Sequence, residues 1–221
     1  MFNPTLSQRI WHKLHLKTTK IRSLLKKRQL TNLDFTIISN NCWGGLTYEE
    51  YGLRKNSPTV GGYIFPVDFL RFVANLREYL SKPLQLISLS QAMHREEIIN
   101  NGNADNIIGK LGDIEIVFVH YRTEQEVLDK WTRRVQRINW KNLIFKFSQQ
   151  NGATFDDLKK FDELELPGKK MMFVNHPNLG YKCGIYYPGF EEEPFVWNDT
   201  FYAHRYFDVT KFINSGIIVQ K

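Results

Sequence analysis

The sequence is poor in cysteine and has no long apolar run. Its 221 residues include two cysteines, Cys42 and Cys183, which are far apart and not in a CxxC spacing. This excludes a disulfide scaffold and a cysteine-based zinc site, and it favours a reducing compartment. No stretch approaches the roughly 18 consecutive apolar residues that a transmembrane helix needs. Because no apolar segment of a secretory signal follows the N-terminal charges either, we expect a cytoplasmic protein.

Motifs for nucleotides and metals are also missing. Neither GxGxxG nor GxxxxGKS/T occurs, which removes the two common nucleotide-binding fingerprints. No DxD occurs, the motif with which glycosyltransferases often hold a metal ion. We therefore predict no metal site and no cofactor.

Acidic residues are absent from the first 30 positions, which hold eight of the 30 lysines and arginines. The other 22 basic residues face 23 acids in residues 31–221, so this part is close to neutral and the basicity belongs to one segment. We divide the chain into a basic amphipathic N-terminal helix, residues 1–30, and an α/β domain, residues 31–221.

The predicted N-terminal helix carries an apolar stripe. Ile10, Leu14, Ile21 and Leu25 recur at helical spacing, and basic residues lie on the flank of this stripe. Such a helix can pack on its own domain, lie on the anionic inner face of the cell membrane, or bind another acidic partner. Nucleic acid is disfavoured, because the positive charge stops at residue 28 and no zinc-finger, RNP-type or basic-zipper pattern accompanies it.

Apolar strands alternate with amphipathic helices along the rest of the chain. Strands are predicted at residues 34–39, 60–65, 84–89, 112–120, 143–147 and 169–175. Helices are predicted from Thr47 as N-cap, over 66–80, over 124–138 behind a Thr123–Glu126 capping box, from Thr154 and over 208–215. This alternation predicts a Rossmann-like α/β fold: a single domain with a mainly parallel sheet flanked by helices.

Three polar strings follow predicted strands, at residues 39–45, 120–121 and 175–176. Because ligands of open α/β sheets bind beyond the carboxyl ends of the strands, these strings should lie together. Cys42 is a candidate nucleophile and His120 a candidate general base. Both also have structural interpretations: Cys42 as an inert buried thiol, and His120 as a strand-end imidazole bonded to the backbone.

The neighbours of these two residues are candidates for ligand binding. Glycines after a strand let backbone N–H groups approach an anion, and polar or aromatic side chains beside them can shape the site. The candidates are Asn40, Asn41, Trp43, Gly44, Gly45 and Tyr121.

Four cations share one face of the predicted helix 124–138, namely Lys130, Arg133, Arg134 and Arg137. They repel each other, and Asp129 is the only acid in this half of the helix. The face therefore suits an anion such as phosphate, pyrophosphate or a carboxylate, which arginine binds as a fork. Salt bridges to acids elsewhere, or plain solvation, are the alternatives.

Taken together, the strings FTIISNNCWGG, SPTVGGYI, DFLRFVANLREYL and GDIEIVFVHYRTEQEVLDKWTRRVQRINWKNL resemble a small bacterial family. Its members are usually labelled exopolysaccharide biosynthesis proteins, or left as a domain of unknown function. The resemblance spans about residues 34–175 and leaves the basic segment 1–30 outside. It implies a role in capsule or exopolysaccharide production and an α/β fold of Rossmann-like character, but no particular reaction. Beyond the candidates above, the residues that match the family's strings are Pro58, Thr59, Asp68 and Trp131.

Three functional hypotheses follow. The first is an enzyme of surface-polysaccharide assembly that transfers a glycosyl group from an activated sugar, with the arginines offsetting phosphate charge and His120 acting as base. The second is acyl transfer or hydrolysis by Cys42 and His120. The third is a non-catalytic binding module of the polysaccharide machinery.

Overall fold

The computed structural model describes residues 21–177, 179–196 and 199–221, and its strands form two four-stranded sheets. The first sheet is parallel throughout, with the order β1-β6-β7-β8. Its strands are β1 (Thr36–Ser39), β6 (Leu143–Ser148), β7 (Gly168–Val174) and β8 (Gly184–Tyr186). A parallel sheet flanked by helices confirms the predicted α/β class, and its carboxyl strand ends all lie at one edge of the sheet.

The second sheet is antiparallel, with the order β2-β5-β4-β3. Its strands are β2 (Tyr63–Ile64), β5 (Ile114–Phe118), β4 (Ile107–Leu111) and β3 (Gln85–Ile87). The sequence pattern assigned three of these strands to a mainly parallel sheet, which is corrected here. Strands β4 and β5 are joined by Gly112 and Asp113 alone, and Gly112 has a φ of +67°. A two-residue loop with positive φ builds a hairpin, because a parallel crossover needs a dozen or more residues.

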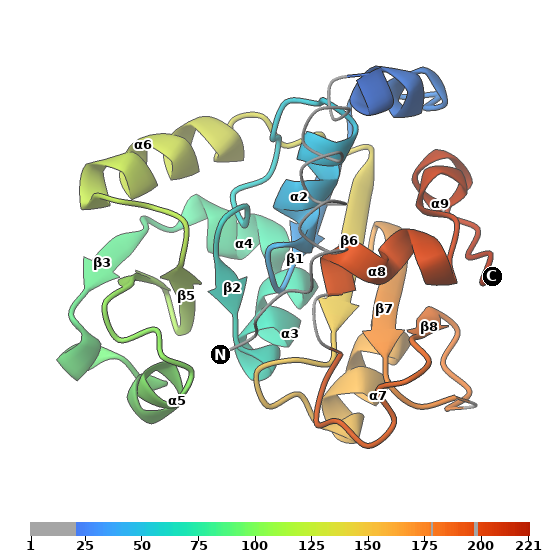
Figure 1. The fold of residues 1–221 in the computed structure, drawn as a ribbon. Helices are drawn as coiled ribbons and strands as arrows, with labels where there is room; N and C mark the ends of the chain where they lie inside the picture. The colour runs from blue at the N-terminus through green and yellow to red at the C-terminus, as the bar shows by residue number, and fades with distance from the viewer. Residues whose placement is uncertain (1–20, 178, 197–198) are drawn as a thin grey trace, which may run out of the picture.

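Helices cover both faces of the parallel sheet (Figure 1). One face is covered by α2 (Trp43–Glu50), α8 (Asp199–Tyr206) and α9 (Val209–Ser215), and the other by α3 (Pro66–Ala74), α4 (Leu76–Ser81) and α7 (Phe155–Glu163). The alternation of strand side chains produces these two layers. Ile37 and Met171 pack with the first group of helices, whereas Ile38 and Met172 pack with the second.

The two sheets share one core. Helix α6 (Glu124–Val135) packs its Val127 and Trp131 in the same apolar cluster that contains Phe145 of the parallel sheet and Ile116 of the antiparallel sheet. The backbone N–H of Ile64 also donates to the carbonyl of Asn40, at 3.0 Å, so the end of β1 is joined to β2. Both observations agree with a single domain. The 3₁₀ turn η1 (Leu89–Gln91) and α5 (Arg95–Asn100) complete the elements.

The helix ends test the predicted caps. Thr154 accepts the backbone N–H of Asp157 at 3.2 Å and forms a full capping box with it. The predicted Thr123–Glu126 box is only half formed: the Thr123 hydroxyl accepts the backbone N–H of Glu126, whereas the Glu126 carboxylate accepts that of Arg122. Asp208 is the N-cap residue of α9. Thr47, in contrast, is buried inside α2, which starts four residues earlier at Trp43. The predicted N-cap at Thr47 is wrong, because the glycine pair after Trp43 belongs to the helix and not to a turn.

The predicted N-terminal helix is described only from residue 21 onward. Residues 21–28 are helical, whereas the rest of the predicted segment up to residue 20 lies outside the described residues. No helix in the described ranges is long and apolar enough to cross a membrane.

Candidate functional site

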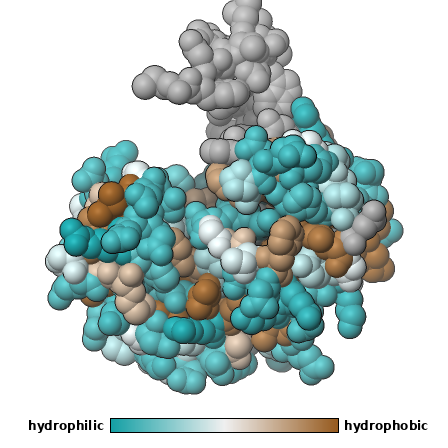
Figure 2. Space-filling view, turned by 90° about the horizontal axis from the view of Figure 1, so that it is seen from below, coloured by the Kyte–Doolittle hydropathy of each residue, from teal (hydrophilic) through white to brown (hydrophobic). Residues whose placement is uncertain are grey.

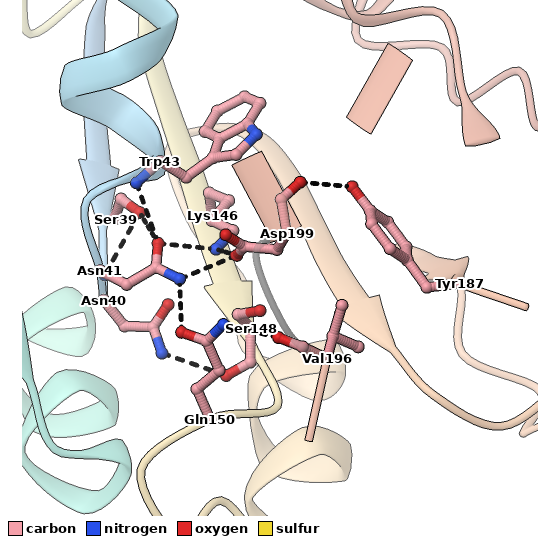
Figure 3. A network of polar contacts seen from close by, with 10 residues as sticks. All are labelled: Ser39, Asn40, Asn41, Trp43, Lys146, Ser148, Gln150, Tyr187, Val196 and Asp199. Carbon is pink, nitrogen blue, oxygen red and sulfur yellow. Dashed lines mark hydrogen bonds and ion pairs between the residues drawn. The ribbon is translucent and has the colours of Figure 1, made fainter. Parts of the chain in front are cut away.

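Polar side chains from the ends of β1 and β6 and from the start of α8 form a buried network (Figure 3). We call Asn41, Lys146, Gln150 and Asp199 the strand-end network. The amide nitrogen of Asn41 donates to Gln150 and to Asp199, at 2.8 Å each, while its oxygen accepts from Lys146 at 2.8 Å. The same oxygen accepts the backbone N–H of Trp43 at 3.1 Å. Asn41 therefore fixes the start of α2 and holds the buried charges.

The two charges of the network are Lys146 and Asp199. The side chain of Lys146 is 0% exposed and lies 2.5 Å from the carboxylate of Asp199, which is 4% exposed. Burial lowers the pKa of Lys146 to about 8, against the opposing effect of the Asp199 charge. Burial raises the pKa of Asp199, but the ammonium of Lys146 and hydrogen bonds more than offset this, so its pKa lies below its usual value. The network is thus an internal ion pair closed to solvent.

Next to this network a pocket of about 250 Å³ opens to solvent at the junction of the two sheets. We call it the basic pocket. Helix α2, the loop after it, the end of β5 and helix α6 contribute its walls. Its lining residues are Cys42, Gly45, Leu46, Glu49, Lys55, Val60, Gly61, His120, Tyr121, Lys130 and Arg134.

One wall of the basic pocket is built around Arg134, which is only 7% exposed. Its guanidinium donates to the carbonyl of Val60 at 3.1 Å and to the hydroxyl of Tyr121 at 2.5 Å. The hydroxyl of Tyr121 in turn donates to the same Val60 carbonyl, at 2.5 Å. Burial raises the pKa of Tyr121 despite the neighbouring Arg134 cation. This wall is therefore rigid, and its positive charge forms no ion pair with a carboxylate in the part of the chain that the structure describes.

Cations outnumber carboxylates around the pocket. Lys55 lies 2.5 Å from Glu49, and Lys130 pairs with Glu126 one helical turn away. The ammonium of Lys130 also lies 5.2 Å from the ring centre of Tyr121. Of the lining residues, three are fixed cations and one is a carboxylate.

The cations next to the pocket strengthen this field. The pKa of Arg137 is lowered by burial and by the charges of Arg54, Arg133 and Arg134. Neighbouring cations that lower the pKa of a guanidinium create a field that favours an anionic ligand.

Cys42 is the N-cap residue of α2 and lines the pocket. Burial raises the pKa of its thiol to about 11, with a further increase from the charge of Asp199 and an opposing effect of Lys146 and Lys55. At neutral pH the thiol is therefore protonated, and a protonated thiol is a poor nucleophile.

His120 is exposed and follows β5. Its backbone N–H donates to the carbonyl of Gly61 at 3.1 Å, which fixes the backbone, while the imidazole remains at the pocket edge. Among the described residues, no hydrogen bond joins the side chains of His120 and Cys42. The two residues share a pocket without forming a pre-assembled dyad.

The basic pocket brings together six of the predicted site residues: Cys42, Gly45, His120, Tyr121, Lys130 and Arg134. Asn40 and Asn41 are buried instead; Asn40 donates to the carbonyl of Ser148 at 3.1 Å. Trp43 is 1% exposed and packs edge-on against Phe173. These three residues build the interior beneath the pocket and do not line it.

Two arginines of the predicted cationic face also lie outside the lining. Arg133 is exposed and Arg137 is half-buried. Lys130 and Arg134 lie four apart on one side of α6 and line the pocket. Arg133 is turned about 100° around the helix from Arg134, and Arg137 lies beyond the end of α6 at Val135.

The glycine pair serves packing. A Cβ at Gly44 would lie 3.0 Å from Cγ2 of Ile37, and one at Gly45 would lie 2.9 Å from Cγ1 of Val60. Both glycines therefore let α2 lie close to β1 and to the pocket loop.

Several lining residues were not predicted, because they belong to no recognisable sequence motif; among them are Glu49, Lys55 and Gly61. Lys146 did carry a signal, since a lysine inside the apolar strand LIFKFS must be buried with a partner. The described residues contain no group of three or more histidine, cysteine or acidic side chains that could hold a metal ion.

Two comparisons with known proteins bear on the chain. A family profile described as "Domain of unknown function (DUF1919)" matches residues 13–215. A protein of Haemophilus influenzae with the description "Uncharacterized protein" is 33% identical over 214 residues, which cover 88% of this chain and 97% of that protein. The similarity extends over nearly the whole relative and so includes both sheets.

Proposed function

We propose that this chain, which belongs to the DUF1919 family, is an enzyme of bacterial surface-polysaccharide biosynthesis. It would transfer a glycosyl group from a phosphorylated donor. The observation that carries the proposal is the basic pocket, where Lys55, Lys130 and Arg134 lie around His120. The polysaccharide context comes from the resemblance of its strings to exopolysaccharide biosynthesis proteins.

The donor would enter with its phosphate toward the cations. Arg134 is held rigidly, so it loses little conformational entropy on binding, and Lys55 and Lys130 can exchange their carboxylate partners for phosphate oxygens. The volume of about 250 Å³ lies below the range of roughly 300–1,000 Å³ typical of pockets that enclose a whole drug-sized ligand. It therefore fits the sugar and its phosphates better than a complete nucleotide sugar, whose base would remain outside.

The proposed reaction is a displacement at the anomeric carbon of the donor sugar. A hydroxyl oxygen of the acceptor forms a bond to the anomeric carbon, and the bond from that carbon to the donor phosphate oxygen breaks. The imidazole of His120 takes the hydroxyl proton. The phosphate leaves with the bonding electron pair, and Lys130 and Arg134 stabilise its charge. The protonated thiol of Cys42 lines the site without reacting.

Isothermal titration calorimetry with sugar 1-phosphates and nucleotide sugars tests donor binding. The variant Lys130→Gln should weaken binding about tenfold, the effect of one lost charge-assisted hydrogen bond. Lys159→Gln is the matched control, since Lys159 of α7 also pairs with a glutamate four residues away, Glu163, but lies outside the lining. Absence of heat with every donor at millimolar concentration, or equal loss in both variants, contradicts the proposal.

His120→Gln separates binding from turnover. This substitution should leave the donor dissociation constant within about twofold and reduce transfer to a polysaccharide acceptor by about 10²–10⁴, the usual contribution of a general base. Binding without any turnover in the unaltered protein would favour the alternative of a non-catalytic binding module.

Thiol-dependent acyl transfer is the second candidate, and one observation favours it: Cys42 and His120 line the same pocket. The raised pKa of the thiol, about 11, argues against it, because attack requires the thiolate. Retention of full activity by Cys42→Ser would remove this candidate.

A further inference from the structure

The helix of residues 21–28 presents its apolar side chains to solvent. Ile21, Leu24 and Leu25 are 65%, 61% and 53% exposed, whereas Ser23 is 8% exposed. With 3.6 residues per turn, Ile21, Leu24, Leu25 and Arg28 lie on the side opposite Ser23. These three side chains therefore do not pack on the part of the domain that the structure describes, so packing on its own domain, one interpretation of the sequence pattern, does not apply to them there.

Ion pairs hold the helix in this orientation. Lys26 pairs with Glu50 of α2, and its ammonium lies 3.0 Å from Nε2 of His204. The imidazole of His204 lies 2.5 Å from the same Glu50 carboxylate. Rotation of the apolar side toward the body would break these contacts, so its exposure is built into the fold. In Figure 1 this helix lies at the edge of the molecule, beyond α2.

The surroundings of the helix are basic. Residues 21–33 contain no acid, and Lys27 and Arg28 follow the anchored Lys26 directly. The helix end is joined to α9, since the side-chain amide of Asn214 donates to the carbonyl of Gln29 at 2.8 Å. A groove of about 560 Å³ runs between them. Its lining has three lysines, Lys26, Lys211 and Lys221, against one carboxylate, Asp208, and it includes Ile217, which is 55% exposed.

We infer that this surface docks on an anionic lipid membrane. Ile21, Leu24 and Leu25 would enter the boundary of headgroups and acyl chains, and Arg28, Lys27 and Lys211 would contact lipid phosphates. An apolar ridge with basic residues around it is the pattern expected of a helix that lies in this boundary. On the face shown in Figure 2, apolar residues are scattered and form no comparable ridge.

The basic residues beside the apolar side of helix 21–28 favour a membrane over a second copy of this chain as its partner. A two-fold dimer through the ridge would bring Lys27 and Arg28 of one copy close to the same residues of the other, because each copy contributes the same patch to a two-fold interface. Like charges in contact weaken such an interface, whereas anionic lipid headgroups neutralise them. The surface therefore fits a lipid membrane better than itself.

Vesicle co-sedimentation of the full chain tests the inference. We expect binding to vesicles of phosphatidylcholine mixed with phosphatidylglycerol, little binding to phosphatidylcholine alone, and weaker binding as salt is added. Leu24→Gln/Leu25→Gln should lower the partition coefficient at least about tenfold, since two side chains lose their burial in lipid. Val67→Gln/Met93→Gln is the matched control, because these side chains are 49% and 53% exposed on other elements.

The outcomes are separable. Equal vesicle binding by the Leu24/Leu25 variant and the unaltered chain overturns the inference, and so does a dimer in light scattering that this variant abolishes while vesicle binding is absent. Thermal melts show that each variant is folded. Sugar-phosphate binding should be unchanged in the Leu24/Leu25 variant, so that failure of this inference is distinct from failure of the proposed transferase.

Discussion

The ammonium of Lys146 lies 2.5 Å from the carboxylate of Asp199, although 53 residues separate them in the sequence and both side chains are buried. This pair joins the centre of the parallel sheet to the first turn of α8. Asn41 bonds to both partners, and its oxygen also accepts the first N–H of α2. The end of β1 and two helices are therefore fixed by one ion pair beneath the basic pocket.

Removal of either charge should be costly, because the other is left buried without a counter-ion. We expect Lys146→Met and Asp199→Asn each to lower the free energy of unfolding by about 3–5 kcal/mol. The double variant should lose clearly less than the sum of the two, since no unpaired charge remains. Urea unfolding followed by circular dichroism measures all three; strictly additive losses would show that the two groups are not coupled.

Three strands of the parallel sheet, β1, β6 and β7, could be predicted within two residues because they are apolar runs with clear ends. Strand β8 was not predicted, because its three residues lie in an aromatic-rich stretch without a clear strand pattern. The antiparallel sheet was harder. Strand β4 begins after an Asn- and Gly-rich stretch, and its hairpin with β5 depends on the backbone conformation of Gly112. Nothing in the local pattern separates such a short hairpin from a loop followed by a strand.

Gly61 supports the rigid wall of the basic pocket. Its φ is +83°, and a Cβ there would lie 2.8 Å from Cε2 of Tyr121, a ring that the Val60 carbonyl and Arg134 hold in place. Gly61→Ala should therefore destabilise the fold by about 1–3 kcal/mol and weaken ligand binding in the pocket. Gly152→Ala isolates the backbone effect, because Gly152 has a φ of +82° and nothing within 4 Å of a Cβ. The prediction is wrong if chemical denaturation gives both variants the same loss.

Part of the site was predictable from chemistry and part was not. Cys42 and His120 were located because each follows a strand, and Lys130 and Arg134 because they lie four apart on a helix. The sequence next to Cys42 contains both residues that line the pocket and residues of the core. Asn41 and Trp43 resemble site residues in the sequence but are buried in the interior. A one-dimensional pattern cannot show which side of a strand end faces solvent, and it contains no trace of Asp199, which reaches Lys146 from a distant helix.

Cys42 should react slowly with alkylating agents. Since burial and the Asp199 charge raise the pKa of its thiol to about 11, only a minute fraction is thiolate near pH 7.5. Mass spectrometry after timed exposure to iodoacetamide should show alkylation slower than that of glutathione. Cys183, which is 4% exposed and has a pKa raised still further by burial, should react more slowly again. Faster labelling of Cys42 than of glutathione would revive the thiol mechanism.

His94 should make the stability of the fold depend on pH. Its Nε2 lies 3.0 Å from Asp68, and this hydrogen bond raises the pKa of the imidazole above its usual value, against the effect of burial. The groups that face it are Asp68, Glu115 and Glu97, all carboxylates. A raised pKa in the folded state means that the folded state binds the proton more tightly than the unfolded chain.

The stabilisation from His94 is therefore fully present below its unfolded pKa of about 6.5 and is lost as the pH rises through its folded pKa. The difference in unfolding free energy between the unaltered protein and His94→Gln should be larger near pH 5.5 than near pH 9, because other titrating groups cancel in the comparison. Asp68→Asn keeps an acceptor for the backbone N–H of Glu115 but removes the charge, so it should reduce this pH dependence to the part that comes from Glu115 and Glu97. An NMR titration of the His94 ring protons with a midpoint below pH 6.5 would contradict the prediction, since the carboxylate would then not be holding the proton on the ring.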